Sequence, residues 1–242
     1  METYFIKAGY EHRTRNATLE ETAGDYWTPY RLAISRHAQY AVYRRAATLI
    51  RAERLRTVID VGCGVGHKLA EMIAPLPEVE GLVGVDQPSC VEVAGRLFPS
   101  LKLVTADFEQ PADSGLEPAD LVMSVDVIEH LLDPDLLLDF MKRHMHAESW
   151  ALLSTPERDV RRGPDNMKSK KAEHVREWNR GEFAAYLDDR GFEVVEHVCL
   201  PAFRVGGSWR MMKDRWRLLR KGISHRYSQV AICRLKPGVS TV

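Results

Sequence analysis

The stretch Val58-Ile59-Asp60-Val61-Gly62-Cys63-Gly64-Val65-Gly66 decides the fold of this chain. Apolar β-forming residues lead into a loop that has a glycine at every second position. Helical sequence follows directly, from Lys68 to Ile73. Glycine suits such a turn because it adopts positive φ and places no Cβ between the main chain and a ligand. The order of strand, glycine loop and helix predicts an α/β domain whose first loop binds a nucleotide-like ligand.

The glycine spacing narrows the type of ligand. The dinucleotide fingerprint G-x-G-x-x-G ends in a glycine that permits close packing around a pyrophosphate. Here Gly62, Gly64 and Gly66 are followed by His67 at that last place. An NAD-dependent oxidoreductase is therefore disfavoured, and the chain shows no obvious site for hydride transfer. The pattern D-V-G-C-G-V-G resembles motif I of the class I S-adenosylmethionine (SAM)-dependent methyltransferases.

Acidic residues at later strand ends extend this resemblance over residues 56–200. Asp86 ends the strand predicted at 82–86, where a carboxylate can accept hydrogen bonds from both ribose hydroxyls. In the family, an acid at the Asp107 position takes the adenine amino group, and the next residue lies along the ring. The resemblance implies SAM as cofactor, bound by Asp60, Gly62, Cys63, Gly64, Gly66, Asp86, Gln87, Asp107, Phe108 and Val125.

The alternation of strands and helices predicts an α/β fold with a Rossmann-like, doubly wound sheet of seven strands. Residues 31–54 have apolar residues at helical spacing and are expected to form one helix. The resemblance implies that the seventh strand, 228–235, pairs antiparallel at the sheet edge. We expect a single domain, 1–242. Its parts are an N-terminal helical cap (1–55), the core (56–200), an insertion (201–227), and the last strand with a tail (228–242).

The charge balance, the apolar runs and the cysteines of the chain narrow its partners and its compartment only slightly. The 242 residues include 34 basic and 34 acidic side chains, so no global field favours nucleic acid or an anionic membrane. No apolar run approaches the roughly 20 residues that a membrane helix needs. The four cysteines form no C-x-x-C pair, and the start of the chain shows no signal pattern. We expect a cytoplasmic protein with reduced thiols.

A second constellation follows the fourth predicted strand, 120–125. Asp126, Glu129 and His130 stand at i, i+3 and i+4, which places them on one side of a helical turn. Their oxygen and nitrogen donors suit a divalent cation. The order resembles the E-x-x-E-H element that holds a metal in ubiquinone-pathway O-methyltransferases and small-RNA 2′-O-methyltransferases. The first position here is the shorter Asp126.

The small-RNA enzymes add a second histidine after the fifth strand, and His174 stands where that pattern places it. We therefore expect Mg²⁺ or Mn²⁺ to be bound by Asp126, Glu129, His130 and His174. Glu129, His130 and His174 are the expected catalytic residues, with either histidine as proton acceptor. The alternative is that the Glu-His pair lines the pocket or caps a helix without metal.

The acceptor is expected to be a small molecule or an oligosaccharide. Residues 154–183 look like methyltransferases that act on saccharides. This favours O-methylation of a sugar hydroxyl, for example in a precursor of a methylated mannose or glucose polysaccharide. An RNA 2′-O-methyltransferase would use the basic stretches 158–171 and 210–226, but the balanced charge makes a nucleic-acid partner less favoured. A catechol or natural-product O-methyltransferase and a non-catalytic SAM-binding subunit stay open, as does a homodimer.

Overall fold

The computed structural model describes residues 4–15, 27–108, 114–203, 212–213, 216, 219–220 and 227–238. Most of the predicted insertion 201–227 lies outside these residues. The strands of the sheet are β1 (Thr57–Val61), β2 (Gly81–Asp86), β3 (Lys102–Thr105), β4 (Ala119–Val125), β5 (Met145–Pro156), β6 (Phe192–Pro201) and β7 (Tyr227–Leu235). The helices are α2 (Pro29–Ser35), α3 (Tyr40–Glu53), η1 (Leu69–Ile73), α4 (Pro88–Leu97), η2 (Ile128–His130), α5 (Pro134–Arg143), α6 (Arg158–Arg162) and α7 (Arg180–Asp189).

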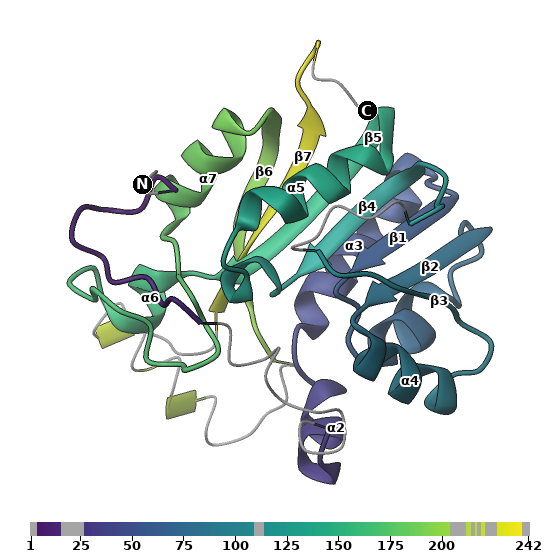
Figure 1. Ribbon diagram of the computed structural model, residues 1–242, viewed down its shortest axis with the longest axis horizontal. Coiled ribbons are helices and arrows are strands. Elements are labelled where there is room, and N and C mark those ends of the chain that lie inside the picture. The colour runs from purple at the N-terminus through teal and green to yellow at the C-terminus, as the bar shows by residue number, and fades with distance from the viewer. Residues whose placement is uncertain are drawn as a thin grey trace.

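The strands form one seven-stranded sheet in the order β3-β2-β1-β4-β5-β7-β6, which confirms the predicted fold class (Figure 1). The first five strands are parallel. Strand β7 is antiparallel, as expected, but it lies between β5 and β6 rather than at the edge. Its run from Ser228 to Cys233 is buried on both faces, which is typical of an interior strand. The edge position belongs to β6, where side chains such as Val195 are exposed.

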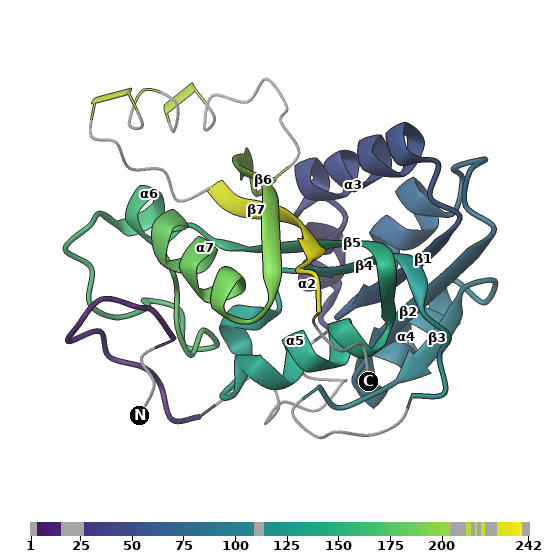
Figure 2. The same ribbon diagram turned by 90° about the horizontal axis from the view of Figure 1, so that it is seen from above.

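Side chains alternate between the two faces of the sheet and build two core layers. On one face Leu121, Met123, Leu152 and Ile232 pack with α3 and η1. On the other face their sequence neighbours, including Val122, Leu153 and Ala231, pack with α5 and α7. Figure 2 shows α3 and α5 on opposite sides of the sheet. Because both faces are covered, the parallel strands end in a shared crevice at their carboxyl edge.

The helix predicted over 31–54 is broken in two, contrary to expectation. Helix α2 ends at Ser35 and α3 begins at Tyr40, and Gln39 between them has a left-handed backbone with φ +58°. The break is held by the end of β6: Gln39 donates its backbone N–H to the carbonyl of Ala202, and Ala38 forms a bridge with Phe203. Tertiary backbone pairing therefore overrides the helical spacing.

The first described segment, 4–15, is irregular rather than part of a helical cap. Its residues contact the loop between α6 and α7, since Arg13 donates its backbone N–H to the carbonyl of Val175. The ring of Tyr10 is buried, and its hydroxyl accepts the backbone N–H of Glu177 at 3.1 Å. The N-terminal segment thus supports a loop about 160 residues away. Within the described part of the chain, no helix is long and apolar enough to cross a membrane.

Candidate active site

A cavity of about 660 Å³ opens at the carboxyl ends of the parallel strands. One end is lined by the glycine loop after β1 and by the first residues after β2 and β3. The other end is lined by η2, by α6, by the loop before α7 and by the residues after β6. A volume of this size suits a small-molecule site.

The glycine loop has the predicted conformation. Gly62, Gly64 and Gly66 have φ of +85°, +58° and +75°, a region that other residues rarely adopt. A Cβ on Gly62 would also collide with the Cγ2 methyl of Val127, whereas a Cβ on Gly64 would meet nothing closer than 3.8 Å. The loop is therefore held close to the chain after β4. Its backbone lies along the cavity, with Cys63 beside the glycines.

Asp86 lies where the ribose of a nucleoside would be expected. Its carboxylate accepts the backbone N–H of Gly64 at 2.7 Å and that of Gln87 at 2.8 Å. Burial raises the pKa of Asp86, against the effect of these two hydrogen bonds. Asp86 and Gln87 both line the cavity. The acid at the end of β2 thus fixes the glycine loop and faces the ligand space.

The other cofactor residues predicted from the family are brought together, with one exception. Asp107, Phe108 and Val125 line the same end of the cavity. The ring of Phe108 is largely buried and makes an edge contact with Phe140, with ring centroids 5.6 Å apart. Only one side of this residue therefore contributes to the ligand space.

Asp60 is the exception, because it does not line the cavity. The alternation of β1 turns its side chain toward α3, where it is fully buried and accepts a 2.6 Å hydrogen bond from the hydroxyl of Tyr43. Burial raises the pKa of Asp60 to about 7, despite that hydrogen bond. Its Oδ1 atom has no hydrogen-bond partner among the described residues. In this structure Asp60 supports the strand that carries the glycine loop.

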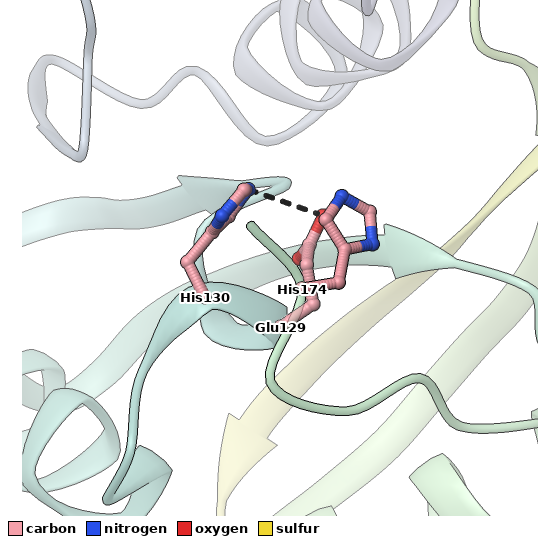
Figure 3. Close-up of side chains that lie close together, drawn as sticks. All are labelled: Glu129, His130 and His174. Atoms are coloured by element: carbon pink, nitrogen blue, oxygen red, sulfur yellow. Dashed lines mark ion pairs between the residues drawn. The ribbon is translucent and has the colours of Figure 1, made fainter. Parts of the chain in front are cut away.

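At the other end of the cavity, Glu129, His130 and His174 converge (Figure 3). One ligand atom from each lies within 4.8 Å of the others. The Nε2 atom of His130 is 3.9 Å from Glu129 Oε1, and the two imidazole centroids are 4.8 Å apart. Glu129 and His174 are buried, and Glu129 Oε2 accepts a hydrogen bond from Thr155 at 3.0 Å. Two imidazoles and a carboxylate form a donor set that could hold a divalent metal.

The second ring nitrogen of each histidine has a defined partner. His130 Nδ1 is 2.8 Å from the carbonyl oxygen of Glu173, which can only accept, so Nδ1 carries the hydrogen. His174 Nδ1 is 2.7 Å from a carboxylate oxygen of Glu177. In a neutral ring with its hydrogen on Nδ1, Nε2 carries the lone pair and is the atom that could bind a ligand. Metal-binding histidines in proteins are oriented by contacts of this kind.

The charge state of this group suits a cation. Burial, and then the negative charge of Asp126, raise the pKa of Glu129 well above its usual range. Burial, and then the charge of His174, lower the pKa of His130 to about 3, so its imidazole is neutral. A buried carboxylate with neutral imidazoles beside it is poorly stabilised as an anion. A bound cation would provide the missing positive charge.

Asp126 does not belong to this group, although the sequence pattern places it there. It follows β4 with a left-handed backbone, φ +54°. Its Oδ1 accepts a hydrogen bond from Ser154 at 2.7 Å, and its Oδ2 accepts one from Ser228 at 3.3 Å. Asp126 lines the cavity but is held against β5 and β7. The i, i+3, i+4 spacing does not apply, because the chain makes a tight turn after β4 and only η2 is helical.

Glu177 was not assigned a role from the sequence. Its side chain is fully buried, and it contacts His174. It binds His174, forms an ion pair with Arg162 at 2.7 Å, and accepts a hydrogen bond from Ser169 at 2.9 Å. Burial would raise the pKa of Glu177, but the hydrogen bonds from His174 and Arg162 lower it well below its usual range. The spacing His174-x-x-Glu177 is the signal that could have identified this carboxylate.

A family model described as a methyltransferase domain matches residues 33–197. A ubiquinone biosynthesis O-methyltransferase of Paramagnetospirillum magneticum is 26% identical over 211 residues, which are 79% of this chain and 78% of that protein. The residues matched by the family model include the glycine loop, Asp86 and the Glu129-His130 pair.

Solved structures share the architecture. The small RNA methyltransferase HEN1 superposes with a TM-score of 0.61 at 21% identity, over 84% of this chain and 26% of that one. An O-methyltransferase of a Brevibacillus brevis polyketide synthase, bound to S-adenosyl-L-homocysteine, superposes with a TM-score of 0.57 at 14% identity, over 82% and 73% of the chains. These likenesses show the fold alone. Together with the family match and the site, they establish that the chain belongs to the methyltransferase domain family and is a class I SAM-dependent methyltransferase.

Proposed function

We propose that this enzyme methylates one hydroxyl of a vicinal pair, on a sugar or oligosaccharide, with the help of a divalent metal. The observation that carries the proposal is the group Glu129, His130 and His174 at the end of the cavity opposite the glycine loop. A metal in this position would face the acceptor and not the nucleoside. Two adjacent oxygens can bind one cation together, which is why a vicinal diol fits the site.

The residues at the other end position the methyl donor. Asp86 offers its carboxylate to the ribose hydroxyls, and the glycine loop offers bare backbone to the rest of the cofactor. When bound, SAM supplies a methyl group that its sulfonium has already activated. The remaining task of the protein is to align the acceptor oxygen with that methyl group and to allow its proton to leave.

Glu129, His130 and His174 would hold the metal through one carboxylate oxygen and two Nε2 atoms. When bound, the metal lowers the pKa of a hydroxyl in the way that it does for water. This assignment takes both histidines as ligands, and a ring nitrogen that binds a cation cannot also accept a proton. We therefore assign neither as general base, and the proton of the acceptor hydroxyl would pass to solvent water. Imidazole donors favour Mn²⁺ over Mg²⁺, since Mg²⁺ prefers oxygen ligands.

A catechol is the second candidate acceptor. It also presents two adjacent hydroxyls, and the relative from Paramagnetospirillum magneticum is by name an O-methyltransferase of ubiquinone biosynthesis. RNA is less favoured, because two arginines of the basic stretch 158–171 are already paired with carboxylates. Arg158 is buried in an ion pair with Glu182, and Arg162 in one with Glu177. Those two charges are not available to phosphates.

The test is a methyl-transfer assay with labelled SAM on three acceptor classes: neutral and acidic sugars, catechols, and a short RNA with a 3′-terminal diol. Each is assayed with EDTA and after addition of Mn²⁺ or Mg²⁺. We expect transfer to a sugar that EDTA abolishes and Mn²⁺ restores better than Mg²⁺. A matched sugar that lacks the adjacent hydroxyl should be a poor acceptor. Full turnover by metal-stripped enzyme would exclude the metal role, and turnover on catechol or RNA alone would exclude the sugar.

A further inference from the structure

Arg161 is a buried arginine that faces the cavity. Its side chain is only 7% exposed, and the residue lines the end of the cavity that holds Glu129, His130 and His174. Its Nε donates to the carbonyl of Tyr227 at 2.6 Å, which fixes the plane of the guanidinium. Among the described residues, no carboxylate forms an ion pair with it. A buried cation without a counter-ion is costly, so its retention calls for an explanation.

The other two arginines on α6, in contrast to Arg161, do form ion pairs with carboxylates. Arg158 binds Glu182 and Asp159, and Arg162 binds Glu177. The two acids nearest in sequence are also engaged elsewhere. Glu157 accepts the backbone N–H groups of Val160 and Arg180, and Asp159 accepts from Arg158 and from Asn179. Three arginines thus lie on one short helix, and among the described residues only Arg161, which lines the cavity, has no carboxylate partner.

The surroundings of Arg161 belong to the acceptor end. Lys171 lines the same end of the cavity, and its charge lowers the pKa of His130 and His174 after the larger effect of burial. Ala202 and Phe203, which follow β6 and pair with Gln39 and Ala38, line the cavity as well. The acids here, Glu129 and Glu173, flank the histidine pair. A ligand at this end therefore meets two cations besides the candidate metal group.

We propose that Arg161 binds an oxyanion, a carboxylate or a phosphate, carried by the acceptor itself. With Nε held by Tyr227, the two Nη groups form the edge of the guanidinium that can face the cavity. That edge matches two oxygens of a carboxylate or phosphate in a bidentate contact. The acceptor class is then an anionic polyol, such as a sugar acid or a sugar phosphate. This assignment rests on the proposed function for the place of the acceptor.

The experiment measures binding without transfer. Full-length protein saturated with S-adenosyl-L-homocysteine, with EDTA present so that no metal binds the anion, is titrated calorimetrically with four probes: D-glucose, D-glucuronate, D-glucose 6-phosphate and orthophosphate. We expect glucuronate or glucose 6-phosphate to bind at least about 10-fold more tightly than glucose. Arg161→Gln, which keeps an N–H for the Tyr227 carbonyl, should remove this preference. Arg161→Lys should keep part of it.

Arg96→Gln on α4 is the matched control, because the side chain of Arg96 is 68% exposed and lies outside the cavity. It should leave the preference unchanged. The proposal is overturned if wild-type protein binds the anionic probes no better than glucose, or if Arg161→Gln preserves the preference. If Arg161→Gln does not fold, the proposal is still tested by the preference of the wild-type protein for the anionic probes and by its partial loss in Arg161→Lys. The readout needs neither turnover nor metal, so failure of metal-assisted transfer would be seen separately in the assay with labelled SAM.

Discussion

His174 donates its Nδ1 hydrogen to Glu177 across 2.7 Å, and both side chains are buried. The carboxylate fixes the tautomer and the orientation of the ring, so that Nε2 is directed to Glu129 and His130. Arg162 in turn holds the carboxylate from the other side. In the proposed metal site Glu177 would be a positioning residue: it would touch no metal, but it would decide where the Nε2 atom of His174 lies.

Replacing Glu177 by Gln should weaken Mn²⁺ binding by about 10- to 100-fold, the range seen when a carboxylate behind a metal-binding histidine is removed. The amide has no charge to favour the Nδ1-protonated ring, and Arg162 loses its partner, so stability also falls. Titration of Mn²⁺ followed by electron paramagnetic resonance measures the affinity. Ser169→Ala removes one hydrogen bond to the same carboxylate and should change the affinity less than about 3-fold. Unchanged affinity in Glu177→Gln would contradict the positioning role.

Asp126 and Glu129 should differ sharply as metal ligands. Glu129→Gln removes the charged oxygen donor of the group and should reduce Mn²⁺ affinity by at least about 100-fold, which corresponds to roughly 3 kcal/mol. Asp126→Asn should reduce it only a few-fold, because Asp126 is held by Ser154 and Ser228 outside the group. Asn also tolerates the left-handed backbone at this position. Equal losses in the two variants would show that Asp126 is a ligand after all.

Gly62→Ala should destabilise the fold through two separable effects. Positive φ costs about 1–2 kcal/mol, and contact with Val127 adds an overpacking cost of about 1–3 kcal/mol. Adding Val127→Ala should recover the second part only. Gly64→Ala shows the first effect alone, since its Cβ would meet no atom closer than Trp27 Cη2 at 3.8 Å. Urea unfolding of the wild type, Gly62→Ala, Gly62→Ala with Val127→Ala, and Gly64→Ala measures the free energy of unfolding of each. No recovery in the double variant would mean that the contact is not the cause.

Asp60 should make stability fall as pH rises. Its pKa is about 7 in the folded protein, against about 3.9 in an unfolded chain, so the folded state keeps a proton that the unfolded state loses. The free energy of unfolding should therefore fall between about pH 4 and pH 7. In Asp60→Asn this part of the pH dependence should vanish, while SAM affinity changes little because Asp60 lies outside the cavity.

Urea unfolding at pH 5 and pH 7.5 compares wild-type protein with Asp60→Asn. Tyr43→Phe is the control: it keeps the carboxyl group but removes the hydrogen bond that lowers its pKa, so the fall should persist or grow. The assignment would be wrong if the difference in stability between wild type and Asp60→Asn were the same at both pH values.

Much of the cofactor end could be predicted from sequence, because it depends on local rules. The glycines at every second position require positive φ, and Asp86 ends a strand at a fixed distance from them. Asp60 was misplaced for an equally local reason: the period of two along β1 points its side chain to the face opposite Ile59 and Val61, toward Tyr43. The family pattern alone does not contain that information.

The acceptor end was less predictable, since it depends on contacts between distant segments. His174 was identified from the family pattern, but its partner Glu177 and the buried ion pairs of Arg158 and Arg162 are set by tertiary packing. In the sequence, the basic stretch 158–171 was assigned only to the RNA alternative. The break between α2 and α3 likewise depends on the carbonyl of Ala202. The spacing of apolar residues within one helix cannot reveal a backbone hydrogen bond to a residue that follows a distant strand.

The support that residues 4–15 give to the loop carrying His174 has a consequence for assembly. The glycine loop, Asp86 and Val125 come from one continuous stretch and need only short-range closures. The loop around His174 is anchored by Arg13 and Tyr10 through contacts spanning about 160 residues, and β7 must enter between β5 and β6. Closing such long loops is slow and entropically costly. We therefore expect the nucleoside-binding half to form first during folding, and the acceptor half to form once residues 4–15 have met the loop that carries His174.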